Sequence, residues 1–220
     1  QAIARDLAVG GTPAWTLVAA AHQTDGRGRH GRTWVDAPGS LLVSVVLRPP
    51  VPAPTAGLIP LLAGAAMAEA CEEVVGSRVT LRWPNDLLVD ERKVGGMIAE
   101  SRIEGDRIAW VVLGVGVNVA SAPDGVEGAA SLGGGEPADV LAAFLRRFAP
   151  LLETEPWAAV RARYVPRCAT LGRRVRARTA AGEVEGNAAD LDETGALVVA
   201  PDAGPPLVLS AGDVVHLAHA

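Results

Sequence analysis

Hydrophobic positions are spaced in two different ways along this chain, and the spacing changes near residues 169–171. Before that point, short apolar runs that suit strands alternate with longer stretches of helical spacing. Strands are expected at 16–21, 41–47, 79–83 continuing through 87–89, 93–101 and 108–118, and helices at 1–9, 57–75, 137–152 and 156–167. The short loops between the last three strands predict antiparallel neighbours in one sheet.

Beyond residue 171, apolar and polar positions alternate in short runs that turn residues separate. Strands are expected at 173–178, 183–189, 196–199, 207–209 and 214–217. Short strands at such close spacing are typical of a small all-β unit. We therefore predict two domains, residues 1–170 and residues 171–220.

The composition is that of a globular protein with a sizeable core. Hydrophobic residues make up 49% of the 220 residues and charged residues 20%, which argues against disorder. The net charge of −5 argues against a general nucleic-acid-binding surface, and no apolar run is long enough to span a membrane. Cys71 and Cys168 lack disulfide or zinc spacing, which favours buried thiols in a reducing cytoplasm. Because the chain starts without methionine inside an expected helix, we expect a longer natural protein.

The most unusual segment is the loop over residues 26–34, Gly-Arg-Gly-Arg-His-Gly-Arg-Thr-Trp. Three arginines within six residues stand out in a chain that is acidic overall. Arginine forks bind phosphate or carboxylate groups, and glycines let backbone N–H groups approach an anion. This pattern favours a loop that orders over an anionic ligand. A solvated basic loop or a nucleic-acid contact would have the same composition.

A second candidate cluster lies in the expected antiparallel strands. Residues 82–86, Arg-Trp-Pro-Asn-Asp, interrupt a strand, as a simple turn or bulge would also do. The turn lengths would place Asn85 opposite roughly Gly96, and Lys93 opposite residues 116–118. Glycines at 95, 96, 114 and 116 would leave the sheet bare there, which is typical of close approach by a ligand. A tightly packed core strand is the alternative for residues 114–118.

Lys93 is the only lysine among the 20 basic residues. The enrichment in Ala, Gly, Val and Arg suggests a coding bias that replaces lysine by arginine wherever either serves. A compact ammonium on a flexible stem follows a phosphate or acyl oxygen as charge develops, which a planar arginine fork does less well. Lys93 is therefore a candidate for such a role, with chance retention as the alternative.

Four segments together resemble the biotin protein ligase family. They are residues 23–34, residues 82–86, residues 93–97 (Lys-Val-Gly-Gly-Met) and residues 114–118 (Gly-Val-Gly-Val-Asn). Their order and spacing match that family over essentially the whole chain. The resemblance implies an α+β fold with a catalytic domain like that of class II aminoacyl-tRNA synthetases. This domain would have a mixed, largely antiparallel sheet flanked by helices, and a small C-terminal SH3-like β-barrel would follow it.

The resemblance also implies an ATP-dependent ligase with two steps. Biotin and Mg²⁺-ATP would form biotinyl-5′-AMP and pyrophosphate, and a lysine of a biotin carboxyl carrier protein would then attack the adenylate. The implied cofactors are ATP, biotin and Mg²⁺, and the implied partner is the carrier domain of a biotin-dependent carboxylase. A homodimer is compatible with this interpretation, whereas a membrane or DNA partner is not supported by these residues.

Carried over by position, the resemblance assigns roles to individual residues. Biotin would be held by Gln23, Gly26, Arg27, Lys93 and Gly96. ATP or the adenylate would be held by Arg29, Arg32, Trp34, Asn85, Lys93 and Asn118. Lys93 and Arg29 would be the catalytic residues, acting by charge stabilisation and positioning. No protein-bound metal is implied.

Two departures and two alternatives accompany the resemblance. A Ser-Thr-Asn segment that usually precedes this region in the family is absent, and Arg82 stands where the family often has lysine. A lipoate or octanoate ligase shares the fold but is not expected to carry both the residue 26–34 loop and residues 82–86. A biotin- or nucleotide-responsive regulatory module is the alternative outside the enzymes.

Overall fold

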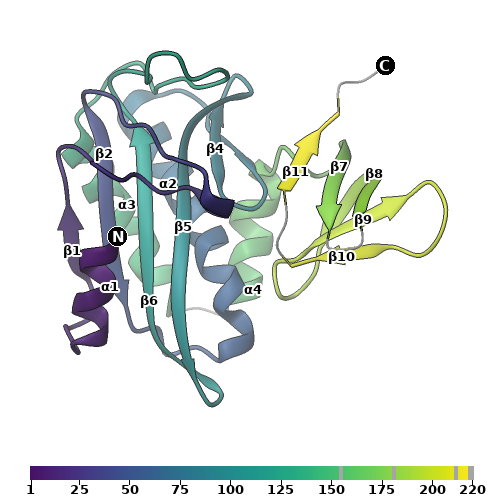
Figure 1. Ribbon diagram of the computed structural model, residues 1–220, viewed down its shortest axis with the longest axis horizontal. Coiled ribbons are helices and arrows are strands. Elements are labelled where there is room, and N and C mark those ends of the chain that lie inside the picture. Colours follow the sequence, from purple (N-terminus) through teal and green to yellow (C-terminus); the bar gives the residue numbers. More distant parts are fainter. Residues whose placement is uncertain (154–155, 180–181, 211–212, 218–220) are drawn as a thin grey trace.

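The computed structural model describes residues 1–153, 156–179, 182–210 and 213–217, whose strands form two separate sheets (Figure 1). The first sheet has the strand order β1-β2-β6-β5-β4-β3. Its strands are β1 (Thr16–Ala19), β2 (Ser40–Leu47), β3 (Thr80–Arg82), β4 (Asp86–Val89), β5 (Arg92–Glu104) and β6 (Arg107–Asn118). Each strand pair in it is antiparallel. The expected α+β fold is confirmed.

The second, smaller sheet has the order β10-β9-β8-β7-β11 and is also antiparallel. Its strands are β7 (Arg174–Thr179), β8 (Gly182–Leu191), β9 (Leu197–Pro201), β10 (Leu207–Leu209) and β11 (Asp213–His216). They match the expected strands to within a few residues. The division into domains at residue 170 stays a prediction.

Helices lie on both faces of the first sheet (Figure 1). On one face are α2 (Leu58–Val75), α3 (Pro137–Leu151) and the segment from α4 (Pro156–Ala159) through η3 (Val160–Tyr164) to η4 (Val165–Arg167). The expected single helix over 156–167 is therefore broken, into an α-turn, a π-turn and a 3₁₀ turn that contains Pro166, a residue without an N–H to donate. A short 3₁₀ turn, η2 (Ala53–Gly57), precedes α2.

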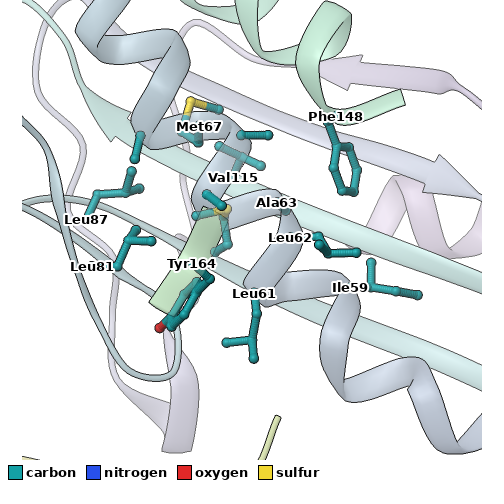
Figure 2. Packing of buried hydrophobic residues seen from close by; sticks show 14 of the residues in the cluster. Ile59, Leu61, Leu62, Ala63, Met67, Leu81, Leu87, Val115, Phe148 and Tyr164 are labelled. Carbon is teal, nitrogen blue, oxygen red and sulfur yellow. The ribbon is translucent and has the colours of Figure 1, made fainter. Parts of the chain in front are cut away.

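The core lies between the first sheet and α2. Most side chains of α2 are buried, because its apolar residues surround the helix axis instead of forming one stripe. Leu61 and Met67 of this helix belong to the same buried cluster as Leu81, Leu87 and Val115 of the strands (Figure 2). All eight residues of β2 are buried as well. The sheet is therefore packed against α2 on this face.

Phe148 of α3 offers a direct test of this core. Its ring is fully buried, stacks on Phe144 with centroids 5.1 Å apart, and meets Trp15 edge-on at 6.0 Å. Phe148→Ala should lower the free energy of unfolding by about 3–5 kcal/mol, because a large cavity remains. Chemical denaturation measures this, with Ile103→Ala at a 51% exposed position as the control, expected within about 0.5 kcal/mol of wild type. Equal losses in both variants would contradict this view of the core.

The opposite face of the first sheet is only half covered by a helix. Here α1 (Ala2–Val9) packs Ala4 and Ala8 against Val46, Trp110 and Val112. The chain between β1 and β2 crosses the remaining half, in front of β6 and β5 (Figure 1).

The second sheet is hydrogen-bonded to the turn over residues 82–86. The Trp83 indole N–H donates to the Gly195 carbonyl at 3.0 Å, and the Trp83 backbone N–H donates to the buried Thr170 hydroxyl at 3.0 Å. Thr170 Oγ1 also lies 3.0 Å from His216 Nε2. These contacts set the turn's position relative to both sheets.

Candidate functional site

A cavity of about 680 Å³ lies between the crossing segment and the uncovered half of the first sheet. Its walls come from residues 22–34, from strands β2, β4, β5 and β6, and from the turn over residues 82–86. Cavities of this size suit small-molecule ligands. The expected site residues that line it are Gln23, Arg27, Arg29, Arg32, Trp34, Asn85, Lys93 and Gly96.

The charges around this cavity oppose the charge of the whole chain. The basic side chains that line it, histidines aside, are Arg27, Arg29, Arg32, Arg82 and Lys93, and the acidic ones are Asp25 and Asp86. The lining is thus positive in a chain of net charge −5. A concave site with such a charge excess attracts anions.

The arginine- and glycine-rich loop folds back on itself as a small hairpin. The Gly28 N–H donates to the Arg32 carbonyl at 2.7 Å, and the Trp34 N–H donates to the Gly26 carbonyl at 2.9 Å, around the short 3₁₀ turn η1 (Arg29–Gly31). A Cβ on Gly26 would lie 2.2 Å from the Trp34 carbonyl oxygen. Gly26 therefore closes the hairpin and, contrary to expectation, does not line the cavity.

The arginines of this loop reach different parts of the cavity. Arg27 donates to the Asp25 carboxylate through Nε and Nη2 at 3.2 and 3.1 Å. Arg29 Nη1 donates to Asn85 Oδ1 at 3.4 Å, which joins the loop to the turn over residues 82–86. The two candidate segments, far apart in sequence, are thus brought together.

The floor of the cavity is a row of paired residues across three neighbouring strands. Asp86 of β4 pairs with Gly96 of β5, and Gly96 pairs with Gly116 of β6. Asn85 was expected opposite roughly Gly96, and the register agrees to within one residue, since the Asn85 carbonyl accepts the Met97 N–H at 3.0 Å. Gly96 and Gly116 contribute no side chains to this floor.

Trp34 lies on the bare floor. A Cβ on Gly116 would be 2.8 Å from Trp34 Cε2 and 3.0 Å from Cζ2, so only glycine leaves room for the indole. The Lys93 ammonium is 5.7 Å from the indole ring centroid, within range of a cation–π contact. Trp34 Nε1 is buried and has no hydrogen-bond partner within the described part of the chain. Trp34 is thus held at the sheet surface with a donor still to satisfy.

A β-bulge turns Lys93 toward this floor. Leu87 pairs with Gly95 and Leu88 with Lys93, so Val94 is an extra residue in β5. In a regular strand, Lys93 and Gly96 would point to opposite faces, because they are an odd number of residues apart. With the bulge, Lys93 Nζ comes within 3.4 Å of where a Gly96 Cβ would be.

The backbone of Lys93 does not pair as expected. Its N–H donates to the Gly128 carbonyl and its carbonyl accepts the Ala130 N–H, both at 2.8 Å. The expectation that Lys93 lies opposite residues 116–118 is therefore wrong. The chain over 128–130 takes this edge of β5, and β6 has already ended at Asn118.

Asn118 also departs from its expected place. Its side chain is buried, donates through Nδ2 to the Ala130 carbonyl at 2.9 Å, and does not line the cavity. The resemblance pointed to Asn118, and the local packing explains why its amide instead holds the chain over 128–130.

Asp86 is the site residue that sequence reasoning passed over. Its Oδ1 lies 2.6 Å from Lys93 Nζ, and its Oδ2 accepts from Arg82 Nη2 at 2.6 Å. Its side chain is 15% exposed. Asp86 belongs to the segment over residues 82–86, whose pattern by itself indicates no more than a turn or bulge at this position. Gln1, Thr24, Ser44 and His216 also line the cavity without having been predicted.

His216 brings the second sheet to the edge of the cavity. Burial, followed by the nearby Arg82 and Arg173, lowers the pKa of His216 from 6.5 to about 4, against a smaller opposing effect of Glu91. Above pH 6.5 the folded and unfolded chains both carry it neutral. Below pH 6.5 the unfolded chain binds the proton first, so stability falls as pH drops toward 4.

Between pH 6.5 and 4, we expect the free energy of unfolding to fall by roughly 1–2 kcal/mol more in wild type than in His216→Gln. This value is reduced because the residue is partly exposed to solvent. Denaturant unfolding at several pH values measures the difference. Parallel stability curves for the two proteins would show that His216 does not titrate in this way.

Among the described ranges, no group of three or more His, Cys, Asp or Glu side chains could hold a metal ion. No helix in the same ranges is long and apolar enough to cross a membrane. Cys71 and Cys168 are free and buried, as expected.

The chain is similar in sequence to known proteins over most of its length. Residues 3–118 match the biotin/lipoate A/B protein ligase family, and residues 170–217 match the biotin protein ligase C terminal domain. The chain is 36% identical over 217 residues to the biotin–[acetyl-CoA-carboxylase] ligase of Mycobacterium tuberculosis, covering 91% of this chain and 79% of that protein. It is 34% identical over 216 residues to the ligase of that name from Paracoccus denitrificans, covering 90% and 88%.

The fold is likewise similar to that of a solved biotin protein ligase, from Aquifex aeolicus in complex with biotin and ATP. The TM-score is 0.77 at 25% identity, covering 96% of this chain and 92% of that one. The match of the second sheet to the C-terminal domain of biotin protein ligases disfavours a lipoate or octanoate ligase. The chain therefore belongs to the biotin/lipoate A/B protein ligase family, as one of its biotin protein ligases.

Proposed function

We propose that this chain joins biotin to a lysine of a biotin carboxyl carrier protein through biotinyl-5′-AMP. In the first step, a biotin carboxylate oxygen attacks the α-phosphorus of ATP and pyrophosphate leaves. In the second step, the carrier lysine attacks the acyl carbon and AMP leaves. The observation that carries the proposal is the Lys93 ammonium, which lies over a glycine floor inside a positively charged cavity.

Both substrates are anionic at the atoms that react, so the charge of the cavity supports this assignment. Lys93 would contact the biotin carboxylate and the α-phosphate and stabilise the charge that develops between them. Arg29 and Arg32 would bind the phosphates, and Gln23 and Arg27 would bind biotin. Preformed donors of this kind lower the barrier because they need little reorganisation during the reaction.

The bare floor and the crossing loop would hold the adenylate between them. Gly96 would leave room for the adenylate. Asn85 would lie beside the adenylate, and Trp34 would close the adenylate against the sheet. We propose no direct contact for Gly26 or Asn118, whose surroundings support structural roles instead.

Magnesium would enter with the nucleotide. Asp86 is already engaged with Lys93 and Arg82, and Asp25 with Arg27. The described residues near the cavity thus suit a metal held mainly by phosphate oxygens, where it would neutralise phosphate charge. The free thiols of Cys71 and Cys168 support a cytoplasmic location. A homodimer stays a prediction that sedimentation analysis can test.

Biotin-dependent exchange of labelled pyrophosphate into ATP tests the first step. We expect exchange with biotin and none with lipoate or octanoate. The second step is tested with a purified biotin carboxyl carrier domain that has its target lysine. It is compared with the same domain in which that lysine is changed to arginine. Exchange with lipoate would support the lipoate ligase alternative. Tight binding of biotin and ATP without exchange would support a regulatory module instead.

A further inference from the structure

Lys93 lies where a neutral amine would compete with the carrier lysine for the acyl adenylate. Its ammonium is inside the cavity, 35% exposed, and next to the floor where the acyl adenylate would lie. A mixed anhydride of a carboxylic acid and a phosphate reacts with any neutral amine, and this is how the carrier lysine would be modified. An amine held beside the anhydride would compete at a high effective concentration.

A protonated amine has no lone pair and cannot attack. Asp86 Oδ1 lies 2.6 Å from Lys93 Nζ, and no other carboxylate among the described residues forms an ion pair with this ammonium. Arg82 holds the carboxylate through Nε at 3.2 Å and Nη2 at 2.6 Å. Asp86 is thereby oriented toward Lys93 from the neighbouring strand.

Most of the other charged side chains around this cavity are cations. Arg27, Arg29 and Arg32 come from the arginine- and glycine-rich loop and Arg82 comes from β3, whereas Asp25, which pairs with Arg27, is the one further anion among the lining residues. The imidazoles of His22 and His216 also line the cavity. Nearby cations disfavour a further positive charge. Without Asp86, the Lys93 ammonium would face these cations and the indole of Trp34 with no carboxylate beside it.

We propose that Asp86 is a positioning residue that keeps Lys93 an ion-paired ammonium, so that the ligase does not transfer biotin to its own lysine. This inference rests on the proposed function. Without Asp86, the neutral amine attacks the acyl carbon of biotinyl-5′-AMP and a C–N bond forms. The bond from the acyl carbon to the phosphate oxygen breaks, AMP leaves with the electron pair, and a proton passes to solvent. The product is a biotinyl amide on Lys93.

The experiment supplies synthetic biotinyl-5′-AMP to purified wild type and Asp86→Asn and follows intact mass, with peptide mapping of the modified residue. We expect the variant to gain one biotinyl group on Lys93 at least about tenfold faster than wild type, as weakened ion pairing would allow. Asp86→Asn combined with Lys93→Arg should remain unmodified at this position. Asp106→Asn, at the exposed turn between β5 and β6, is the matched control and should behave as wild type.

A second measurement does not depend on adenylate binding. Acetylation of Lys93 by an N-hydroxysuccinimide ester is followed against pH, and half-maximal reactivity should move to lower pH in Asp86→Asn. An unchanged pH profile would overturn the proposal. A variant that binds the adenylate but modifies Lys93 no faster than wild type does would also overturn it. If wild type neither forms nor binds biotinyl-5′-AMP, the proposed function fails, whereas the pH profile still decides whether Asp86 keeps Lys93 protonated.

Discussion

Lys93→Arg should lower the rate of biotinyl-5′-AMP formation by about 10²–10³-fold, the usual cost of losing one preformed charge stabiliser. The ammonium of Lys93 fits the space above Gly96, 3.4 Å from a Cβ that glycine lacks. A guanidinium is wider and planar, and it forms two parallel hydrogen bonds with a carboxylate. We therefore expect arginine to be held by Asp86 and to point away from the reacting oxygen atoms.

Pyrophosphate exchange at saturating biotin and ATP measures this loss, and thermal unfolding shows whether the fold is retained. Arg92→Lys makes the reverse exchange at the preceding residue, whose guanidinium donates to the Ala129 carbonyl outside the cavity. This control should stay within about threefold of wild type, since surface changes have small effects. Near-normal exchange by Lys93→Arg would remove Lys93 from the proposed chemistry.

Gly116→Ala should speed the escape of the adenylate by about 10- to 100-fold. The added methyl group would lie 2.8 Å from Trp34 Cε2, so the indole must leave the floor or the strand must shift. Forcing a methyl group into a filled space costs about 1–3 kcal/mol, which corresponds to this change in rate. Gel filtration of the enzyme with labelled adenylate, sampled over time, measures how quickly the ligand is lost.

A double-mutant cycle with Trp34→Ala separates this effect from general damage to the sheet. In the Trp34→Ala background the methyl group meets no ring, so Gly116→Ala should change the escape rate less than about twofold. Additive effects of the two substitutions would mean that Trp34 does not lie on Gly116 during ligand binding.

Local sequence signals predicted most of the fold. Apolar runs of strand length over 41–47 and 108–118 correspond to β2 and β6, and the apolar stretch over 57–75 corresponds to α2, which ends at the left-handed residue Gly76. These signals are reliable because burial of a whole strand or helix depends on many residues at once. The broken segment after Pro156 was missed, because its π- and 3₁₀ turns have nearly the spacing of an α-helix.

The sequence by itself determined which chemistry the site would contain. Arginines between glycines, one retained lysine and bare strand positions already indicated an anion site, because residue type alone sets charge and side-chain volume. The resemblance to biotin protein ligases implied that the segment before Trp34 and the turn at Asn85 would serve one ligand. The hydrogen bond from Arg29 to Asn85 joins these two segments in the fold.

Only the tertiary structure decided how those residues face one another. The extra residue Val94 puts Lys93 on the same face as Gly96, and pairing between strands sets Asp86 against that lysine. The chain over 128–130 covers Asn118. A bulge and a strand register depend on how distant segments pack, and a one-residue change in either reverses the face that a side chain occupies. Local sequence patterns therefore could not reveal the ion pair on which our further inference rests.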